Sequence, residues 1–319
     1  LLFFTTDGMA YKIKTWRLPL GGRTAKGKAI VNILPIPAGV SVAAIMPVDR
    51  EEAEWGDLQI VFATTQGDVR RNRLSDFTNV MRNGKIAMKL PEGVELVNAR
   101  ICSEDDDIML VTDSGRAIRF SVTDVRVFKG RDSTGVRGIR LRGDDKVVSM
   151  AVIRHFDATA EERAGYLKMR RAMAGVADEA EADEDEEAVF GAISAERYAE
   201  MSAVENLILT ITAKGSGKLS SSHDYPVRGR GGMGVTAMDK AMRGGDIVAC
   251  FPVEMEDQIM LATSKGQSIR VPVEGISFRS RSAGGVKVFN TGKGEEVVSV
   301  AWIADPSDDE DTPEDSVEE

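Results

Sequence analysis

The chain has 319 residues, of which 42% are hydrophobic and 29% charged, and this composition is ordinary for a globular protein with a sizeable core. No run of 18 consecutive apolar residues occurs, so the sequence predicts no membrane-spanning helix. Two cysteines and two histidines lie far apart, without the spacing of metal ligands, so we expect reduced, buried thiols and no metal site. The chain opens inside a repeat and without a signal-peptide pattern, which indicates a piece of a longer protein.

The net charge of −10 is spread unevenly along the chain. Residues 157–205 hold 14 acidic and 5 basic residues, and residues 305–319 hold 9 acidic residues and no basic one. The rest of the chain carries 36 Lys and Arg against 28 Asp and Glu. A basic body with two acidic segments indicates a polyanionic partner and an internal competitor for that partner.

A pattern of about 50 residues recurs along the chain. Each copy opens on a short apolar run, turns at a glycine, continues through an alternating strand and a basic, glycine-containing segment, and closes on another apolar run. The turn glycines are Gly8, Gly67, Gly115, Gly215 and Gly266. Apolar runs joined by a glycine turn predict β-hairpins, and about four short strands per copy are typical of a β-propeller blade, with a linear β-solenoid as the alternative.

We therefore predict an all-β fold, a closed, propeller-like array of four-stranded blades in a single domain over residues 1–304. Its repeats are expected at about 1–56, 57–105, 106–156, 206–256 and 257–304.

Residues 157–205 interrupt the repeats and are predicted to form an acidic insertion that is partly helical or disordered. Thr159 and Glu162 have the spacing of a helix capping box, and a second short helix is expected over 193–204. The insertion is interpreted either as a solvated loop between blades or as a regulatory arm.

Several strings resemble the C-terminal domain of the A subunit of bacterial DNA gyrase, a type IIA topoisomerase: LLFFTTDG, RTAKGKAIVNILPI, STGVRGIRLRGDDKVVSM and DQIMLATSKGQSIRVPVEGIS. The resemblance covers the five repeats and the acidic tail. It implies a β-pinwheel of six blades, in which neighbouring repeats exchange strands and a basic rim wraps double-stranded DNA. The signature box of the family, Gln-Arg-Arg-Gly-Gly-Lys-Gly, is absent, and its nearest counterpart, residues 228–234, has Met233 in place of the lysine.

Basic residues gather in the same stretch of every repeat, between the second hairpin strand and the glycine segment. Equivalent loops of a radial repeat lie at equal angles around one rim, so these bases are expected to form a curved track for DNA phosphates. The candidate DNA-binding residues are Arg23, Lys26, Lys28, Arg70, Arg71, Arg73, Arg82, Lys85, Arg119, Arg126, Lys129, Arg131, Arg137, Arg140, Lys218, Arg228, Arg230, Arg270, Arg279, Arg281 and Lys287.

The expected function is sequence-nonspecific binding, bending and wrapping of double-stranded DNA, which would enable ATP-dependent negative supercoiling by the whole gyrase. By this resemblance the partners are the remainder of the gyrase A subunit, together with the gyrase B subunit, in the cytoplasm with the bacterial nucleoid. No catalytic residue and no cofactor are expected in this chain, since ATP and magnesium would be used by other parts of the enzyme. The alternatives are the C-terminal domain of topoisomerase IV and a protein-binding propeller scaffold.

Residues 305–319 are predicted to be a disordered acidic tail that competes with DNA for the basic rim, or else only a solubilising tail. The acidic residues assigned to this regulatory role are Asp308, Asp309, Glu310, Asp311, Glu314, Asp315, Glu318 and Glu319. Two further patterns are interpreted as structural: the G-x-G-x-x-G string within 229–234 lacks an adjoining strand and helix, and Asp105, Asp106 and Asp107 fall in a predicted turn.

Overall fold

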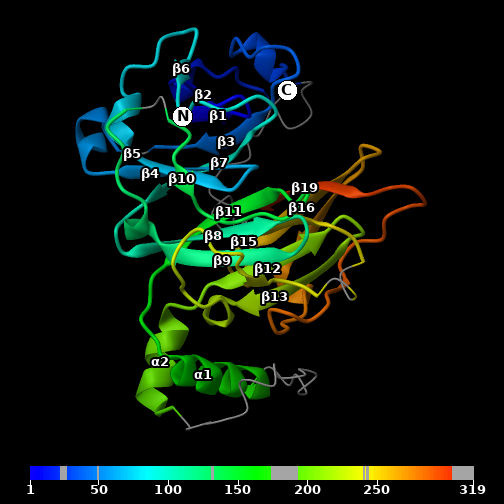
Figure 1. The fold of residues 1–319 in the computed structure, drawn as a ribbon. Coiled ribbons are helices and arrows are strands. Elements are labelled where there is room, and N and C mark those ends of the chain that lie inside the picture. Colours follow the sequence, from blue (N-terminus) through cyan, green and yellow to red (C-terminus); the bar gives the residue numbers. More distant parts are fainter. Residues whose placement is uncertain are drawn as a thin grey trace, which may run out of the picture.

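The computed structural model describes residues 1–21, 27–48, 50–130, 133–173, 193–239, 241 and 244–303. Within these ranges the chain is mostly β-structure, with two α-helices that lie below the sheets (Figure 1). Arg23, Lys26 and Arg131, together with the acidic residues of the tail, lie outside the described residues.

Five antiparallel sheets follow one another along the chain, and each takes its first three strands from one repeat. These strands are β1 (Leu2–Thr5), β2 (Met9–Lys12) and β3 (Val42–Met46) in the first sheet, β4 (Gln59–Thr64), β5 (Asp68–Arg73) and β7 (Leu96–Cys102) in the second, β8 (Asp106–Thr112), β9 (Arg116–Ser121) and β11 (Val147–Arg154) in the third, β12 (Leu207–Thr212), β13 (Ser216–Ser221) and β15 (Ile247–Val253) in the fourth, and β16 (Gln258–Thr263), β17 (Ser268–Pro272) and β19 (Val297–Ile303) in the fifth.

The fourth strand of each of the first four sheets has only two residues and comes from the following repeat. These strands are β6 (Lys85–Ile86), β10 (Val136–Arg137), β14 (Val235–Thr236) and β18 (Val286–Lys287), which pair with β2, β5, β9 and β13. The exchange of strands between neighbouring repeats is therefore confirmed. The fifth sheet departs from the four-stranded prediction and has three strands, because the described residues contain no following repeat to supply the fourth.

A short 3₁₀ helix follows the second hairpin strand of every repeat. These helices are η1 (Thr15–Arg17), η4 (Leu74–Phe77), η5 (Val122–Asp124), η6 (Ser222–Asp224) and η7 (Val273–Gly275). Two others, η2 (Ile30–Asn32) and η3 (Glu52–Gly56), lie before and after β3.

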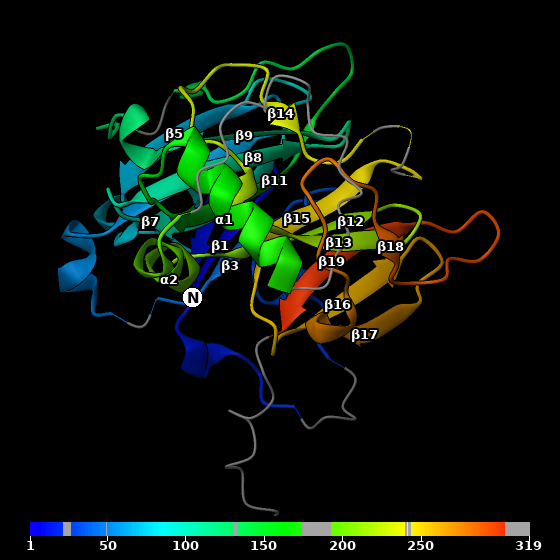
Figure 2. The same cartoon turned by 90° about the horizontal axis from the view of Figure 1, so that it is seen from below.

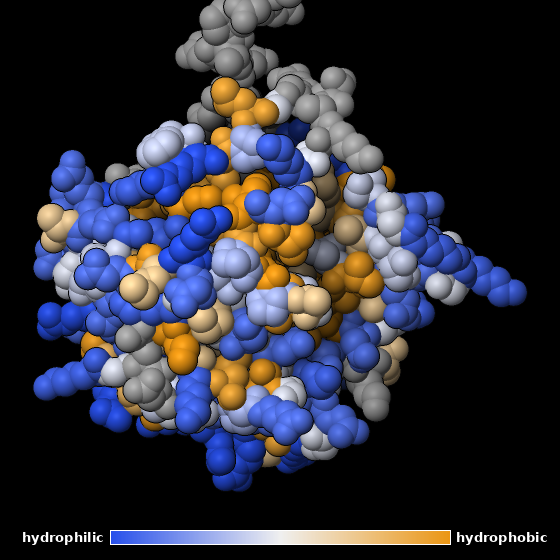
Figure 3. All heavy atoms as spheres, turned by 90° about the horizontal axis from the view of Figure 1, so that it is seen from above, coloured by the Kyte–Doolittle hydropathy of each residue, from blue (hydrophilic) through white to orange (hydrophobic). Residues whose placement is uncertain are grey.

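The sheets are arranged radially around a shared axis. The innermost strands β3, β7, β11, β15 and β19 contribute side chains to one cavity of about 340 Å³, from Ala43 of β3 to Trp302 of β19. Each of these strands also contacts the next one along the chain. The arrangement is that of a propeller rather than of a linear solenoid, and hydrophobic atoms gather in the middle of the face seen from above, with hydrophilic atoms around its periphery (Figure 3).

The hydrophobic core lies between neighbouring sheets. Phe4 of the first sheet meets Phe62 and Phe77 of the second repeat edge to face or nearly so, with ring centroids 5.4 and 5.6 Å from Phe4. Equivalent buried clusters join the second sheet to the third, the third to the fourth and the fourth to the fifth. Because apolar faces are buried only between blades, each blade depends on its neighbour for stability.

The hairpin turn has the same construction in every repeat. The backbone carbonyl of a buried threonine accepts the N–H of the turn glycine three residues later, over 2.9 to 3.0 Å in all five turns. In four of them the threonine hydroxyl also accepts the N–H of the residue after that glycine. The threonines are Thr5, Thr64, Thr112, Thr212 and Thr263.

The carbonyl of the turn glycine joins each blade to the next. The Gly215 carbonyl accepts N–H groups from Val288 and Phe289 over 2.9 and 3.0 Å, and Gly8 and Gly67 make the same pair of bonds to their following repeats. Gly215 has a φ of 75°, and a Cβ placed there would lie 2.3 Å from the Phe289 carbonyl oxygen. Gly266 has a φ of 80° but nothing within 4 Å of such a Cβ, since no following repeat among the described residues lies against the fifth sheet.

The described part of the insertion is folded and packed, which excludes a solvated loop there. Helices α1 (Ala160–Met173) and α2 (Ala195–Ala203) lie across one face of the third and fourth blades (Figure 2). The capping box at Thr159 and Glu162 is confirmed by reciprocal bonds of 2.8 and 3.1 Å. Buried Tyr166 stacks on Tyr198 and meets the edge of His223, with ring centroids 4.9 Å apart in both pairs.

Arg170 extends this contact to the fifth repeat. Its guanidinium lies 4.7 Å from the Phe278 ring centroid, and its Nε atom is 3.1 Å from Glu205. The two helices therefore connect the third, fourth and fifth repeats on the face seen in Figure 2.

A buried charge network marks the point where the chain leaves the third blade for the insertion. Asp107 is fully buried and accepts hydrogen bonds from Arg119 Nε over 2.8 Å and from His155 Nδ1 over 2.8 Å. Burial alone would lower the pKa of His155, but its hydrogen bonds and charge interactions with Asp107 and then Asp157 raise the pKa above the ordinary value.

We predict that Gly215→Ala destabilises the chain more than Gly266→Ala. Both substitutions place alanine at a positive φ, which costs about 1 kcal/mol or somewhat more. Only Gly215→Ala must also displace the Phe289 carbonyl, which adds about 1–3 kcal/mol. Urea unfolding of the two variants measures the difference, and equal losses would contradict this role of the glycine carbonyl.

We predict that His155→Gln lowers stability more at about pH 5.5 than at about pH 9. The folded-state pKa of His155 lies above its unfolded value of about 6.5, so its stabilisation is complete below that value and is lost as the pH rises through the folded pKa. Urea unfolding of parent and variant at both pH values is the measurement. A difference that grows with pH would show that His155 is neutral in the folded chain.

Candidate nucleic-acid interface

The candidate bases differ in exposure to solvent. Half-buried ones are Lys85, Arg279 and Arg281, and four are buried. The exposed ones are Lys28, Arg73, Arg82, Arg126, Lys129, Arg137, Arg140, Arg228, Arg230, Arg270 and Lys287.

The four buried bases, Arg70, Arg71, Arg119 and Lys218, were wrongly predicted to contact DNA. Their exposed fractions are 5% or less, so an external phosphate cannot reach them. The Lys218 ammonium donates to the carbonyls of Ser280, Arg281 and Ala283 in the following repeat, and burial lowers its pKa to about 7.

The buried arginines act in the same way. Arg70 donates to the Ser133 carbonyl over 2.7 Å, and Arg119 donates to the Ser222 carbonyl over 2.8 Å. Successive residues of a strand point to opposite faces of the sheet. In a blade both faces are covered by neighbours, so two adjacent bases in the second hairpin strand can both be buried. These cations hold the loop of the next repeat.

The exposed bases are densest where the third and fourth blades meet. The segment 228–234 of repeat four lies along the glycine segment 135–142 of repeat three. Gly231 donates its N–H to the Gly138 carbonyl over 2.6 Å, and the Arg140 N–H donates to the Gly232 carbonyl over 2.8 Å. The Arg230 side chain donates to the carbonyls of Asp124 and Arg137 over 3.0 and 3.1 Å. Bases from two repeats are thus held on one surface.

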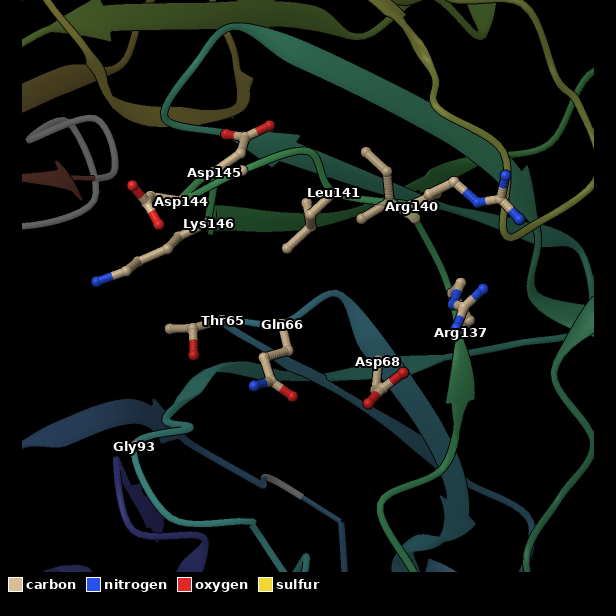
Figure 4. Close-up of a pocket in the computed structure, with 12 residues that line it drawn as sticks. Thr65, Gln66, Asp68, Gly93, Arg137, Arg140, Leu141, Asp144, Asp145 and Lys146 are labelled. Atoms are coloured by element: carbon tan, nitrogen blue, oxygen red, sulfur yellow. The ribbon is translucent and has the colours of Figure 1, made fainter.

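A polar pocket of about 620 Å³ adjoins this surface, between the β4–β5 turn and the loop that follows β10. Figure 4 shows Arg137 and Arg140 at one end of the pocket, with Asp68 beside Arg137, and Asp144, Asp145 and Lys146 at the other end. Burial raises the pKa of Asp68, and the charge of Arg137 opposes this shift.

Asp145, at the end of the pocket where Lys146 lies, forms a close pair with Asp113. Burial and the neighbouring Asp145 carboxyl raise the pKa of Asp113 to about 6. The N–H groups of Ser114 and Lys146 donate to Asp145 and Asp113 respectively over 3.1 Å. The pair joins the β8–β9 turn to the loop before β11, and it lies at the edge of the basic surface.

Two exposed or half-exposed arginines on this surface are absent from the predicted set. Arg142 is exposed and donates its Nε–H to the Met233 sulfur over 3.1 Å. Arg116 is half-buried and donates to the carbonyls of Met233 and Gly234 over 3.2 and 2.6 Å. Arg142 follows Arg140 by two residues in the same basic, glycine-containing segment, so its place in that segment could have identified it.

Bases near the fourth and fifth blades are more often paired with carboxylates. The backbone N–H of Arg281 donates to Asp224 over 2.7 Å, and its Nε lies 3.8 Å from the same carboxylate. Lys214 pairs with Glu296 over 2.8 Å. Their charge is partly compensated within the protein.

In the described ranges, no three His, Cys, Asp or Glu residues gather as metal ligands. Cys102 and Cys250 are free and buried, as predicted, and burial raises their pKa to about 12 and about 11. None of the described helices is long and apolar enough to cross a membrane.

The fold and this surface define a class of protein: a β-propeller whose blades exchange short strands and whose rim exposes bases from several repeats. The sequence matches the family described as DNA gyrase C-terminal domain, beta-propeller, over residues 1–49, 59–103, 106–154, 206–254 and 257–301. The chain belongs to this family. The insertion with α1 and α2 lies between two of the matched segments.

Curated relatives that are named as the A subunit of DNA gyrase come from several bacteria. The protein of Granulibacter bethesdensis is 45% identical over 99% of this chain and 35% of its own length, and that of Rickettsia bellii is 41% identical over 97% and 34%. The protein of Salmonella typhimurium is 33% identical over 98% of this chain and 29% of its own length. The chain spans about a third of the length of these relatives.

Solved structures share the fold. The C-terminal domain of DNA topoisomerase IV gives a TM-score of 0.71 at 19% identity, over 96% of this chain and 79% of that one. The C-terminal domain of DNA gyrase A gives 0.67 at 18% identity, over 95% and 81%.

We predict that Lys218→Met lowers stability and leaves the salt dependence of DNA binding unchanged. Three carbonyls lose their donor, which costs about 2 kcal/mol or more. Arg137→Ala, at an exposed position, is the matched variant: its stability stays within about 0.5 kcal/mol of the parent, and its log–log salt slope falls by about 1. If Lys218→Met flattened the salt slope of DNA affinity and kept native stability, Lys218 would have to contact DNA rather than the loop of the next repeat.

Proposed function

We propose that this chain binds, bends and wraps double-stranded DNA without sequence preference. The observation that carries the proposal is the recurrence of exposed bases from every repeat on a radial fold, from Lys28 in the first repeat to Lys287 in the fifth. Membership of the gyrase C-terminal domain family supports it.

Contacts between these exposed bases and DNA phosphates carry little information about the DNA sequence. Arginine and lysine side chains on loops and short strands neutralise phosphates and release counterions, so the affinity falls with salt. A convex rim that neutralises phosphates along its curve favours a bent path, and the cost of bending depends on how easily the DNA deforms.

The larger role is supported by the relatives named as gyrase A subunits. In this proposal the chain is the wrapping part of a gyrase, joined to the remainder of the A subunit in a complex with the B subunit in the bacterial cytoplasm, and it presents DNA for ATP-dependent negative supercoiling. The chain itself contributes no cofactor site, and ATP and magnesium act in other parts. The acidic tail 305–319 stays a proposed competitor for the rim.

The C-terminal domain of topoisomerase IV remains the nearest alternative. Its fold match at 19% identity does not separate the two enzymes, and the 33–45% identity to proteins named as gyrase A subunits favours gyrase. A protein-binding scaffold is the alternative from another class, and it predicts no affinity for DNA.

We predict that the chain binds linear duplexes of unrelated sequence with similar affinity. The slope of log affinity against log salt should be about −0.9 for each neutralised phosphate. Fluorescence anisotropy at several salt concentrations measures the slope, and fluorescence transfer between the ends of a labelled duplex measures bending. An affinity that is absent at low salt would exclude the wrapping function and favour the scaffold.

A further inference from the structure

We propose that the seam between the third and fourth blades is the strongest phosphate-binding site on the rim. This inference rests on the proposed DNA binding and locates its main anchor. The site, called the seam cluster, consists of Arg137, Arg140 and Arg142 from repeat three and Arg228 and Arg230 from repeat four. Its ligand is the phosphate backbone of duplex DNA.

The backbone beneath the seam cluster is fixed by hydrogen bonds between the two repeats. The Arg228 N–H donates to the Arg119 carbonyl over 2.8 Å, and the bonds between Gly231 and Gly138 and between Arg140 and Gly232 continue the pairing. Strand β14 then pairs with β9 at Val235 and Thr236. A loop held at this many points loses little further freedom when DNA binds, so more of its contact energy appears as affinity.

The charge of the seam cluster is left for an external anion. None of the ion pairs among the described residues involves these five arginines, all of which are exposed. Where Arg230 is held within the protein, its partners are neutral carbonyls. The Asp68 carboxylate lies beside Arg137 at the same end of the pocket (Figure 4), but it is not among the ion pairs of the described residues.

The seam between the fourth and fifth blades offers less free charge. Asp224 accepts from Arg281, and Arg171 of α1 lies 3.9 Å from the same carboxylate. Arg281 Nε lies 3.8 Å from Asp224, and Lys214 pairs with Glu296 over 2.8 Å, whereas the Lys287 ammonium donates to a neutral carbonyl, that of Lys214. Bases that already have carboxylate partners gain less from a phosphate, because the existing pair must be broken.

Arg142 gives the seam cluster a cation beside Met233. The guanidinium reaches across the seam and donates Nε–H to the sulfur, so its position is fixed by a side chain of the neighbouring repeat. The 228–234 loop has no lysine of its own. Arg142 of repeat three therefore adds a positive charge beside Met233 to the charges of Arg228 and Arg230 on the same loop, and its fork of donors suits phosphate oxygens.

The test compares two triple variants of the chain on a linear mixed-sequence duplex. The first is Arg140→Ala with Arg142→Ala and Arg230→Ala. The second removes the same charge from exposed bases of the fifth repeat, with Lys265→Ala, Arg270→Ala and Lys287→Ala. Arg50→Ala, an exposed base outside the proposed DNA surface, is the single-charge control, and circular dichroism with urea unfolding shows that each variant is folded.

We expect the seam triple to flatten the log–log salt slope by about 2.7, which is about 0.9 for each contact. Arg142→Ala alone should flatten it by about 0.9, so that between 50 and 200 mM salt the parent loses about 3.5-fold more affinity than the variant. The fifth-repeat triple should have a smaller effect, and Arg50→Ala should leave the slope unchanged.

A parent chain that binds DNA while the seam triple keeps its affinity and slope would overturn the seam cluster and leave the wrapping function standing. A fifth-repeat triple that costs as much as the seam triple would also overturn it, since the anchor would then not be local. A parent chain without DNA affinity would instead remove the proposed function. Arg142→Lys should retain most of the slope if charge is what Arg142 supplies, and a loss equal to that of Arg142→Ala would reduce Arg142 to a packing role.

Discussion

In the first four blades, a short strand from the following repeat completes the edge of the sheet, and the other features of the fold follow from this contact. A sheet edge exposes unpaired N–H and C=O groups, and proteins cover such edges to avoid promiscuous pairing. Here the following repeat supplies a two-residue strand that pairs with the edge of the preceding blade. The N–H groups next to that strand donate to the carbonyl of the turn glycine. The same step fixes the angle between blades and encloses an apolar cluster between them. Local turn chemistry, core formation and the spacing of the rim loops therefore follow from one repeated contact.

This contact also divides the positive charge into two kinds. Bases in the second hairpin strand, such as Arg70 and Lys218, lie between blades and donate to carbonyls of the next loop. Bases in the glycine segments lie outside and keep their charge for a partner, as Arg137 and Arg140 do. A charged group is stable inside a seam only where carbonyls or carboxylates satisfy it. The count of bases in the sequence therefore overstates the charge that an external polyanion can reach.

The insertion adds a second set of contacts to the repeat plan. Tyr166 and Met201 are fully buried, and Arg170 reaches the fifth repeat at Phe278. The helices pack on the η6 side of the fourth blade, and Arg171 approaches Asp224, which also accepts from Arg281. The described part of the insertion thus supports blades three to five and takes part in the contacts that hold the rim base Arg281.

The repeats, their strands, the glycine turns and the capping box at Thr159 could all be predicted from the sequence, because these features depend on neighbours close in the chain. A threonine also stands three residues before each turn glycine in the sequence, but its burial and its two backbone contacts appear only in the fold. Only the tertiary contacts show which bases face solvent, since Arg71 and Arg73 lie on the same face of β5, yet Arg71 is buried and Arg73, at the end of the strand, is exposed. The tertiary structure also decided that Arg142 lies beside Met233, because residues 91 positions apart meet only when one repeat closes the edge of another.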